Sequence, residues 1–416
     1  MAGHPELLIP ASSLEVLKTA VIFGADAVYI GGEAFGLRAK AKNFSHEDMQ
    51  EGIAFAHGHG VKVYVTVNIL AHNRDLMGVR EYLKELKGLE PDALIIADPG
   101  IFEMAKEICP EIERHISTQA NNTNYAAYQF WWKQGAKRVV TARELSLQEI
   151  REIRDNIPEE MEIESFIHGA MCISYSGRCL LSNYFTGRDA NQGACTHPCR
   201  WKYAVVEETR PGEYMPVYEN ERGTFIFNSK DLCMIGHIPE LVEAGVDSLK
   251  IEGRMKTALY VASAARTYRK ALDDYAQSPE LYQKNMPWYL DQISNCTYRQ
   301  FTTGFYFGRP DENTQIYDSN TYVREYIYLG IVGEVKDGMC RIEQRNKFSA
   351  GEEIEIMKPG GENVSVTVKR IMDEEGNAME SAPHPKQVLY VEFEGGNADV
   401  YDILRKKEEQ AAQVHC

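Results

Sequence analysis

Residues 23–32 read FGADAVYIGG, and the same arrangement returns at residues 134–142, QGAKRVVTA, and at residues 244–253, AGVDSLKIEG. Each stretch places a glycine where a preceding helix would end in a left-handed turn, and a short aliphatic run follows. Such runs are typical of strands that are buried on both faces of a sheet. The repetition predicts one architecture that is built from helix and strand units.

Eight strands of this type can be placed along the chain, with helical periodicity between them. Eight repeats over roughly 250 residues match a closed (β/α)8 barrel of the TIM type. An open doubly wound sheet is the alternative, but the glycine-rich dinucleotide fingerprint is absent after the first strand. The expected strands are Glu6 to Pro10, Ala27 to Gly31, Lys62 to Asn68, Ala93 to Asp98, His115 to Gln119, Arg138 to Thr141, Glu162 to His168 and Ser248 to Glu252.

The pattern of residue types changes after about residue 275. An aromatic, irregular stretch is followed by short alternating segments with glycine and asparagine turns, which predict a small antiparallel β-barrel. We therefore expect an α/β protein with four parts. These are a barrel over 1–275 with an insertion between its seventh and eighth strands, a packed connector over 276–325, a small β-barrel over 326–405 and a tail over 406–416.

The composition limits the classes of protein that are possible. The chain has 416 residues, 45 lysines and arginines, 61 acidic side chains and a net charge of -16, which argues against broad nucleic-acid binding by phosphate neutralisation. A local basic face remains possible around Arg178, Arg188, Arg200 and Lys202. The start lacks a basic leader and no run of eighteen apolar residues occurs, so we expect a soluble, cytoplasmic protein with no membrane partner.

Cysteine is concentrated in one short stretch, at Cys172, Cys179, Cys195 and Cys199, with Cys233 downstream. Because cytosolic thiols are kept reduced, this density favours metal or cluster ligation over disulfides. Tetrahedral zinc sites normally use two tight CxxC-type pairs, so a structural zinc site is an alternative that fits these intervals less well. An iron-sulfur cluster tolerates wider gaps between its ligands. The alternative is that two or three of the cysteines are buried as small apolar side chains.

Polar residues stand where the expected strands end, which is the face of a (β/α)8 barrel that carries chemistry. The cysteine-bearing insertion between the seventh and eighth strands would lie over the same face. The two patterns therefore predict one site at the barrel mouth. The strand-end residues are Asn68, Asp98, Gln119 with Asn121, Arg143 with Glu144, His168, and Glu252 with Arg254.

The segment ESFIHGAMCISYSGRCLLSN, from Glu164 to Asn183, resembles the signature of peptidase family U32, whose members carry a collagenase-like label. ELLIPASS, GADAVYIGG, NQGACTHPCRW, FNSKDLC, LKIEGRMK and TTGFYFG are similar to other landmarks of that family. The resemblance covers essentially the whole chain, including the C-terminal part, which corresponds to the family's own C-terminal domain type.

Family members of this length and layout resemble prephenate-dependent tRNA uridine hydroxylases. The resemblance implies an oxygen-independent hydroxylation of uridine 34 in the tRNA anticodon loop to 5-hydroxyuridine, with prephenate as co-substrate. It also implies a [4Fe-4S] cluster that is held by four cysteines. Cys172 and Cys179 match two ligands, Cys195 and Cys233 are the choice for the others, and Cys199 is the substitute for either.

Roles for the other site residues follow from the chemistry of these ligands. A dicarboxylate calls for guanidinium partners, for which Arg143, Arg200 and Arg254 are the candidates, and Gln119 is a further substrate-binding residue. His168 and Glu252 are candidates for the general acid or base, with Arg254 also counted as catalytic. His168 is alternatively a hydrogen-bond partner behind the cluster. The candidates for stacking on a base are Tyr175, Tyr184, Phe185 and Trp201.

A peptidase is the alternative in the same family. It would need a metal-bound water or an activated nucleophile, but no HExxH motif occurs: His46 and Glu47 are followed by Gln50. No GxSxG elbow occurs either, and Cys172 with His168, four residues earlier, is a candidate thiol and imidazole pair. A thiolate that ligates iron is not free to attack a peptide bond. Two further alternatives are a hydroxylase that acts on an rRNA cytidine or a quinone precursor, and a subunit that requires a paralogue as partner.

Overall fold

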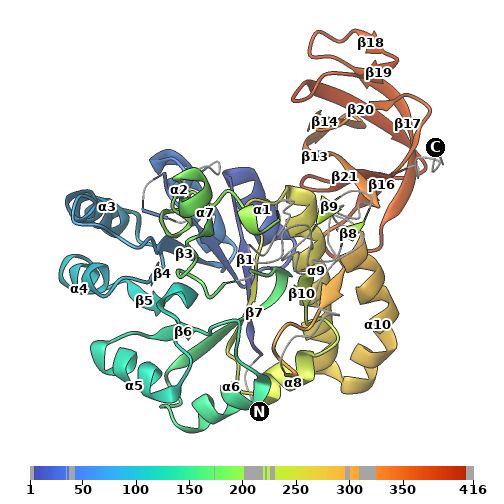
Figure 1. The fold of residues 1–416 in the computed structure, drawn as a ribbon. Coiled ribbons are helices and arrows are strands. Elements are labelled where there is room, and N and C mark those ends of the chain that lie inside the picture. The colour runs from blue at the N-terminus through green and yellow to red at the C-terminus, as the bar shows by residue number, and fades with distance from the viewer. Residues whose placement is uncertain are drawn as a thin grey trace, which may run out of the picture.

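The computed structural model describes residues 4–33, 35–36, 43–172, 174–200, 219–220, 223–224, 230–295, 300–308 and 325–408. It contains a barrel of parallel strands surrounded by helices, and a smaller antiparallel β domain beside it (Figure 1). The predicted fold class is therefore confirmed. In the part of the chain that the structure describes, no helix is long and apolar enough to cross a membrane.

The large barrel closes because its last strand pairs with both its first and its seventh. Ser248 lies opposite Glu6 in one pairing and opposite Glu164 in the other, and both pairings are parallel. The eight strands are β1 (Glu6–Pro10), β2 (Ala27–Ile30), β3 (Lys62–Val67), β4 (Ala93–Ile96), β5 (Glu113–Ile116), β6 (Arg138–Val140), β7 (Glu162–Ala170) and β11 (Ser248–Ile251).

The fifth strand differs from the prediction by a few residues. It was expected over His115 to Gln119, but β5 ends at Ile116 and a short 3-10 helix, η1 (Thr118–Ala120), follows. Ser117 causes the change, because its side chain accepts a hydrogen bond from the Gln119 backbone and so caps the turn. Gln119 consequently stands on the loop above the strand rather than within it.

Helices cover the outside of the barrel and begin at the polar caps that the sequence supplies. Ser146 and Glu149 form a complete capping box at the start of α6, and Gly135 closes α5 with a φ of +94°, as the repeated helix-ending glycines predicted. The helices are α1 (Leu14–Ile22), α2 (His46–Gly58), α3 (Leu76–Leu89), α4 (Pro99–Ile108), α5 (Tyr125–Gln134), α6 (Leu147–Asp155), α8 (Ile238–Glu243) and α9 (Ala258–Gln277).

The insertion between β7 and β11 carries short elements of its own. These are α7 (Leu181–Thr186), η2 (Ala190–Gln192), η3 (Pro198–Arg200), β8 (Glu219–Asn220), β9 (Gly223–Thr224) and β10 (Asp231–Cys233). Strand β10 has no counterpart among the predicted strands. It pairs antiparallel with the end of β7, and β12 (Phe301–Thr302) extends it in parallel. This addition is possible because β7 is nine residues long and continues past the barrel.

The C-terminal domain is a sheet of antiparallel strands that closes through the pairing of β16 with β17, as predicted for a small barrel. Helix α10 (Pro279–Ser294) and the end of α9 precede it. Its strands are β13 (Tyr326–Lys336), β14 (Met339–Glu343), β15 (Phe348–Ser349), β16 (Glu353–Met357), β17 (Val364–Met372), β18 (Ala378–Met379), β19 (Ser381–Ala382), β20 (Val388–Glu394) and β21 (Ile403–Lys407).

The two domains are joined by apolar and polar contacts on the outer helices. Met357 and Ile403 of the small domain belong to the same buried cluster as the core of the large barrel. Arg266 of α9 donates to Lys358 O at 3.0 Å and to Asn363 Oδ1 at 2.7 Å. Figure 1 shows the small domain beside the barrel, next to α9 and α10. The barrel mouth is therefore left to the cysteine-bearing insertion.

Candidate active site at the barrel mouth

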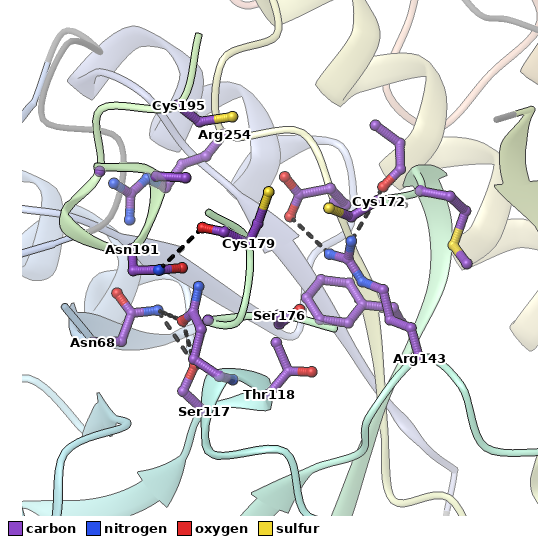
Figure 2. Close-up of a pocket in the computed structure, with 18 of the residues that line it drawn as sticks. Asn68, Ser117, Thr118, Arg143, Cys172, Ser176, Cys179, Asn191, Cys195 and Arg254 are labelled. Atoms are coloured by element: carbon purple, nitrogen blue, oxygen red, sulfur yellow. Dashed lines mark hydrogen bonds and ion pairs between the residues drawn. The ribbon is translucent and has the colours of Figure 1, made fainter. Parts of the chain in front are cut away.

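A pocket of about 340 Å³ lies at the carboxyl ends of the strands, between the barrel and the insertion (Figure 2). It is where the sequence predicted the chemistry, because strand-end residues and the cysteine-bearing segment meet there. The strand side contributes Asn68, Ser117, Gln119, Arg143, Phe166, Lys250, Glu252 and Arg254, and the insertion contributes Cys172, Tyr175, Cys179, Asn191, Cys195 and Cys199.

Contacts with two barrel loops hold the insertion over the mouth. Asn121 Nδ2 donates to Ser176 O at 2.6 Å, next to the turn that carries Cys179. The Leu70 backbone donates to Asn191 O at 3.1 Å, and Asn191 Nδ2 in turn donates to Cys179 O at 3.2 Å. The loops after β3 and β5 therefore position the cysteine segment against the pocket.

Four of the five candidate cysteines line this pocket: Cys172, Cys179, Cys195 and Cys199. Cys172 is exposed and the other three are half-buried. Figure 2 shows Cys172, Cys179 and Cys195 around the same hollow. As a donor set these thiols fit an iron-sulfur centre or a thiolate-bound metal. In the described residues, however, no three metal-ligating side chains already stand together as a preformed group.

Cys233 is not among the residues that line the pocket. It lies in β10, is buried, and its Sγ is 3.8 Å from Tyr268 Oη. Burial raises the pKa of this thiol to about 11. It stands opposite His168 in the pairing of β10 with β7, so it belongs to a buried group behind the mouth.

His168 shares that buried group. Its Nδ1 is 3.4 Å from Tyr268 Oη, and its ring packs near Tyr260 and Phe301. Burial lowers the pKa of His168 to about 4, so the ring is neutral at pH 7. It does not line the pocket, and this position matches the alternative of a partner behind the cysteine segment better than that of an acid or base in contact with substrate.

Arg143 lies across the pocket wall, on the face of Phe166. Its Cζ is 4.0 Å from the centre of the Phe166 ring, and its Nη2 is 3.6 Å from Glu252 Oε2. Within the described part of the chain its hydrogen bond goes from Nη1 to Ala170 O at 3.3 Å, and the buried Nε has no partner. A guanidinium carries five N–H donors, so Arg143 retains capacity for an anionic ligand.

Gly169 brings Glu252 to Arg143. It has a φ of +105°, and a Cβ at this position would lie 2.4 Å from Glu252 O. The pairing of β7 with β11 shifts its register between Lys250 and Ile251, next to this glycine. A glycine is therefore required for the two strands to approach closely enough to place Glu252 beside the pocket.

Two more cations reach the pocket from the end of β11. Arg254 is buried and its Nη1 donates to Thr66 Oγ1 at 2.7 Å. Lys250 is also buried, forms an ion pair with Glu164 at 2.6 Å, and lies 4.3 Å from the centre of the Tyr29 ring. The strand-end pattern predicted Arg254 but not Lys250, although a lysine inside a buried strand segment was a signal for it.

A cluster of amide and hydroxyl groups forms the opposite wall. Asn68 Nδ2 donates to Gln119 Oε1 at 2.9 Å and to Ser117 Oγ at 3.3 Å (Figure 2). The Ser117 hydroxyl donates to the same Gln119 oxygen at 3.0 Å. Gln119 Nε2 forms no hydrogen bond in the described part of the chain, so it is available to donate to a ligand carbonyl.

The remaining predicted residues have other positions. Asp98 caps α4 by accepting from the Gly100 and Ile101 backbones, and it does not line the pocket. Tyr184 and Phe185 are exposed on α7, whereas Tyr175 reaches the pocket rim. The side chain of Arg200, together with Lys202 and Trp201, lies outside the described residues. Besides Lys250, sequence reasoning missed Phe166 and Ser117, which carry no pattern distinct from ordinary strand residues.

This arrangement defines a (β/α)8 barrel protein whose ligand pocket is capped by a cysteine-bearing insertion. The chain belongs to peptidase family U32. The sequence model of that family matches residues 12–316, and the model of the family's C-terminal domain matches residues 324–405. The resemblance seen in the sequence motifs is thereby confirmed.

Several named proteins are similar to this chain over most of its length. "tRNA hydroxylation protein P1" of Bacillus subtilis is 44% identical over 92% of this chain and 91% of its own length. "tRNA hydroxylation protein P" of Escherichia coli is 40% identical over 91% of each. A protein of Methanocaldococcus jannaschii that is named an uncharacterized protease is 42% identical over 74% of each.

Proposed function

We propose that this protein is a cytoplasmic tRNA hydroxylase that converts uridine 34 to 5-hydroxyuridine, with prephenate as the oxygen donor and without molecular oxygen. The observation that carries the proposal is the high identity, over about nine-tenths of both chains, to proteins named for tRNA hydroxylation. The pocket adds support, because it combines groups for a pyrimidine, groups for a carboxylate and a set of thiols.

The reaction replaces the C5–H bond of uracil with a C5–OH bond, which oxidises the base by two electrons. The prephenate carbon that gives up its hydroxyl oxygen is reduced by two electrons and gains the hydrogen, so the exchange balances. The chain must therefore hold both substrates in one pocket with the donor oxygen near C5. Positioning of this kind contributes a large part of many enzymatic rate enhancements.

The amide wall is suited to the base. Uracil presents two carbonyl oxygens and one N–H along its edge, and side-chain amides complement both kinds of group. Gln119 Nε2 is free to donate to a uracil carbonyl, and Asn68 and Ser117 hold the Gln119 amide in one orientation by binding its oxygen. We assign the base-recognition role to Gln119, supported by these two residues.

Two guanidinium groups line the pocket and are suited to prephenate. Arg143 lies flat on Phe166 with unused donors, whereas Arg254, from the loop after β11, reaches across to Thr66 of β3. Each of the two carboxylates of prephenate would therefore meet one guanidinium group, that of Arg143 or that of Arg254. Glu252, beside Arg143, is the carboxylate in position to accept a proton from a bound substrate.

The thiols of the cysteine segment support the proposal of a [4Fe-4S] cluster. Cys172, Cys179 and Cys195 line the pocket and would supply three ligands. The fourth place falls to Cys199, which also lines the pocket, or to Cys233, whose strand pairs with β7 just before Cys172. When bound, such a cluster supplies electron transfer, or Lewis acidity if one iron lacks a protein ligand.

The decisive experiment uses protein that has been purified without oxygen. It is incubated with tRNA that lacks the modification and with prephenate labelled with oxygen-18 at its ring hydroxyl, and the nucleosides are analysed by mass spectrometry. We expect labelled 5-hydroxyuridine that requires prephenate and forms under nitrogen. Iron and sulfide analysis of the same preparation tests the cluster.

Three outcomes would count against the proposal. One is the absence of product, both with the protein alone and after addition of a family paralogue from the same organism. Another is product with another RNA nucleoside or a quinone precursor in place of uridine 34. The third is an iron-free preparation that cleaves gelatin, which would favour the peptidase interpretation.

A further inference from the structure

The outer side of the insertion presents large apolar side chains to solvent. Tyr184 is 82% exposed, Leu180 71%, Tyr175 49% and Phe185 46%. Tyr184 and Phe185 lie edge to face with ring centres 5.2 Å apart, and Tyr175 also lines the pocket. We call these four side chains, together with Arg178 and Arg188, the apical surface. Figure 1 shows α7, which carries part of it, above the barrel.

The charge of this segment is opposite to that of the chain as a whole. Residues 172–202 contain four arginines and lysines and a single acidic residue, whereas the full chain has 45 basic and 61 acidic side chains. Arg178 and Arg188 are exposed, and neither forms an ion pair within the described part of the chain. The single acidic residue, Asp189, accepts a hydrogen bond from the Asn191 backbone N–H at 2.8 Å.

The part of the apical surface that α7 carries is held in place by three hydroxyl groups. Ser182 is buried in α7, and its Oγ is 2.9 Å from Thr196 Oγ1, which in turn is 3.2 Å from Thr186 Oγ1. These bonds tie α7 to the stretch of chain that leads from Cys195 towards Cys199. The aromatic rings are therefore presented outward from a fixed base, which lowers the entropic cost of binding.

We propose that the apical surface is the docking platform for the single-stranded RNA loop whose base enters the pocket. Unpaired bases stack on exposed aromatic rings, and arginines without acidic partners bind the phosphates between them. The lack of exposed acidic side chains among residues 174–197 favours a polyanion over a protein partner. This inference rests on the proposed function, because it names the surface that delivers the RNA to that site.

The experiment measures the dissociation constant of an anticodon stem-loop RNA by fluorescence anisotropy across a series of salt concentrations. Y184A/F185A and R178Q/R188Q are compared with two controls on the outer helices, F130A on α5, where Phe130 is 53% exposed, and R80Q on α3, where Arg80 is 48% exposed. All six side chains are exposed, so thermal unfolding should change little, and this is measured for each variant.

We expect Y184A/F185A to bind on the order of tenfold more weakly or worse, as for loss of a stacked base, and the controls to match wild type. R178Q/R188Q should flatten the slope of log K against log salt by ~0.7 for each phosphate that the variant no longer neutralises. Unchanged affinity and slope in both double variants would overturn the inference. Unchanged RNA binding combined with loss of a complex with a family paralogue would assign the surface to that protein instead.

The inference and the proposed function can fail separately. If wild type forms 5-hydroxyuridine and both double variants retain full affinity and activity, the surface is wrong and the function stands. If the variants lose RNA affinity but wild type makes no 5-hydroxyuridine, the surface stands and the reaction is wrong.

Discussion

The two ends of the large barrel use the same kinds of side chain for opposite purposes. At the amino end, the Arg138 guanidinium is enclosed by Glu6 at 2.6 Å, Glu162 at 2.6 Å and Glu164 at 3.2 Å. At the carboxyl end, Arg143 has one ion pair at 3.6 Å and unused donors. The comparison teaches that buried charge is satisfied within the protein at the amino end and keeps donor capacity for a ligand at the carboxyl end.

The amino-end network is closed on all sides. Ser248 and Tyr64 also donate to the Glu6 carboxylate, at 2.8 and 2.6 Å, and Lys250 binds the far oxygen of Glu164 at 2.6 Å. Burial alone would raise the pKa of Glu6, but Arg138 and these hydrogen bonds lower it to about 2. The charged groups at the amino end therefore have no capacity left to bind a ligand. This is expected, because the amino end of a (β/α)8 barrel contributes to stability rather than to chemistry.

The largest expected effect of a substitution is at the carboxyl end of the barrel, in the cysteine segment. Cys172→Ser or Cys179→Ser should abolish bound iron and lower hydroxylation by more than ~100-fold, because direct ligands matter more than the groups behind them. Iron content and product formation are measured against Cys340→Ala, in the small domain, which should retain both. Full iron content in Cys172→Ser would show that this residue is not a ligand.

The same assay separates the two candidates for the fourth ligand. Cys199→Ala and Cys233→Ala are compared for iron content, and the one that supplies the fourth thiolate should lose iron while the other retains it. Full iron content in both variants would mean that three cysteines are sufficient.

The next largest effect is expected at the amino end of the barrel. Arg138→Gln should lower the free energy of unfolding by about 3–5 kcal/mol, because it leaves several buried carboxylates without their cation. The Michaelis constant for prephenate should not change, since Arg138 does not line the pocket. Chemical denaturation measures the first quantity. A matched control is Arg151→Gln, where the exposed ion pair to Glu243 spans 3.8 Å and should contribute less than ~0.5 kcal/mol.

Glu6 makes the stability that the amino end contributes sensitive to acid. Its pKa is about 2 in the folded protein and 4.5 in the reference state, so its contribution to stability is complete above pH 4.5 and disappears as the pH falls towards 2. The difference amounts to about 3 kcal/mol. Unfolding free energies measured between pH 6 and the lowest pH at which unfolding is reversible should fall less steeply in Glu6→Gln than in wild type. Parallel curves for the two proteins would contradict this account.

The smallest expected effect is at Arg143. Arg143→Gln should raise the Michaelis constant for prephenate about 30-fold, equivalent to about 2 kcal/mol for hydrogen bonds to a charged group, with little change in stability. Arg143→Lys should recover only part of the loss, because an ammonium group cannot form two parallel hydrogen bonds or stack on Phe166. If Arg143→Gln instead lowered stability as much as Arg138→Gln, the two ends of the barrel would not differ as described.

Particular residues show where sequence reasoning reached its limit. Gln119 was correctly predicted to lie near the mouth. The strand that precedes it begins at Glu113, two residues before the predicted start at His115, but the predicted and the observed strand both lead into the same loop. Cys199 and Cys233 could not be separated, since both follow the signature at permissive intervals. Phe166 was missed because an inward residue of a buried strand looks the same whether it faces core or pocket. Ser117 was missed because it fell inside the strand that was predicted over His115 to Gln119, whereas β5 ends at Ile116.

The amino-acid sequence by itself determined the closed parallel barrel, the small antiparallel barrel after it and the position of the cysteine segment over the mouth. Periodicity, glycine caps and family motifs are local along the chain, and they can be read without coordinates. Only the tertiary structure decided that Arg143 lies on Phe166, that Lys250 pairs with Glu164 and that Cys233 is buried while Cys199 lines the pocket. Such contacts depend on strand register and on the path of the insertion, which bring together side chains that are distant in sequence.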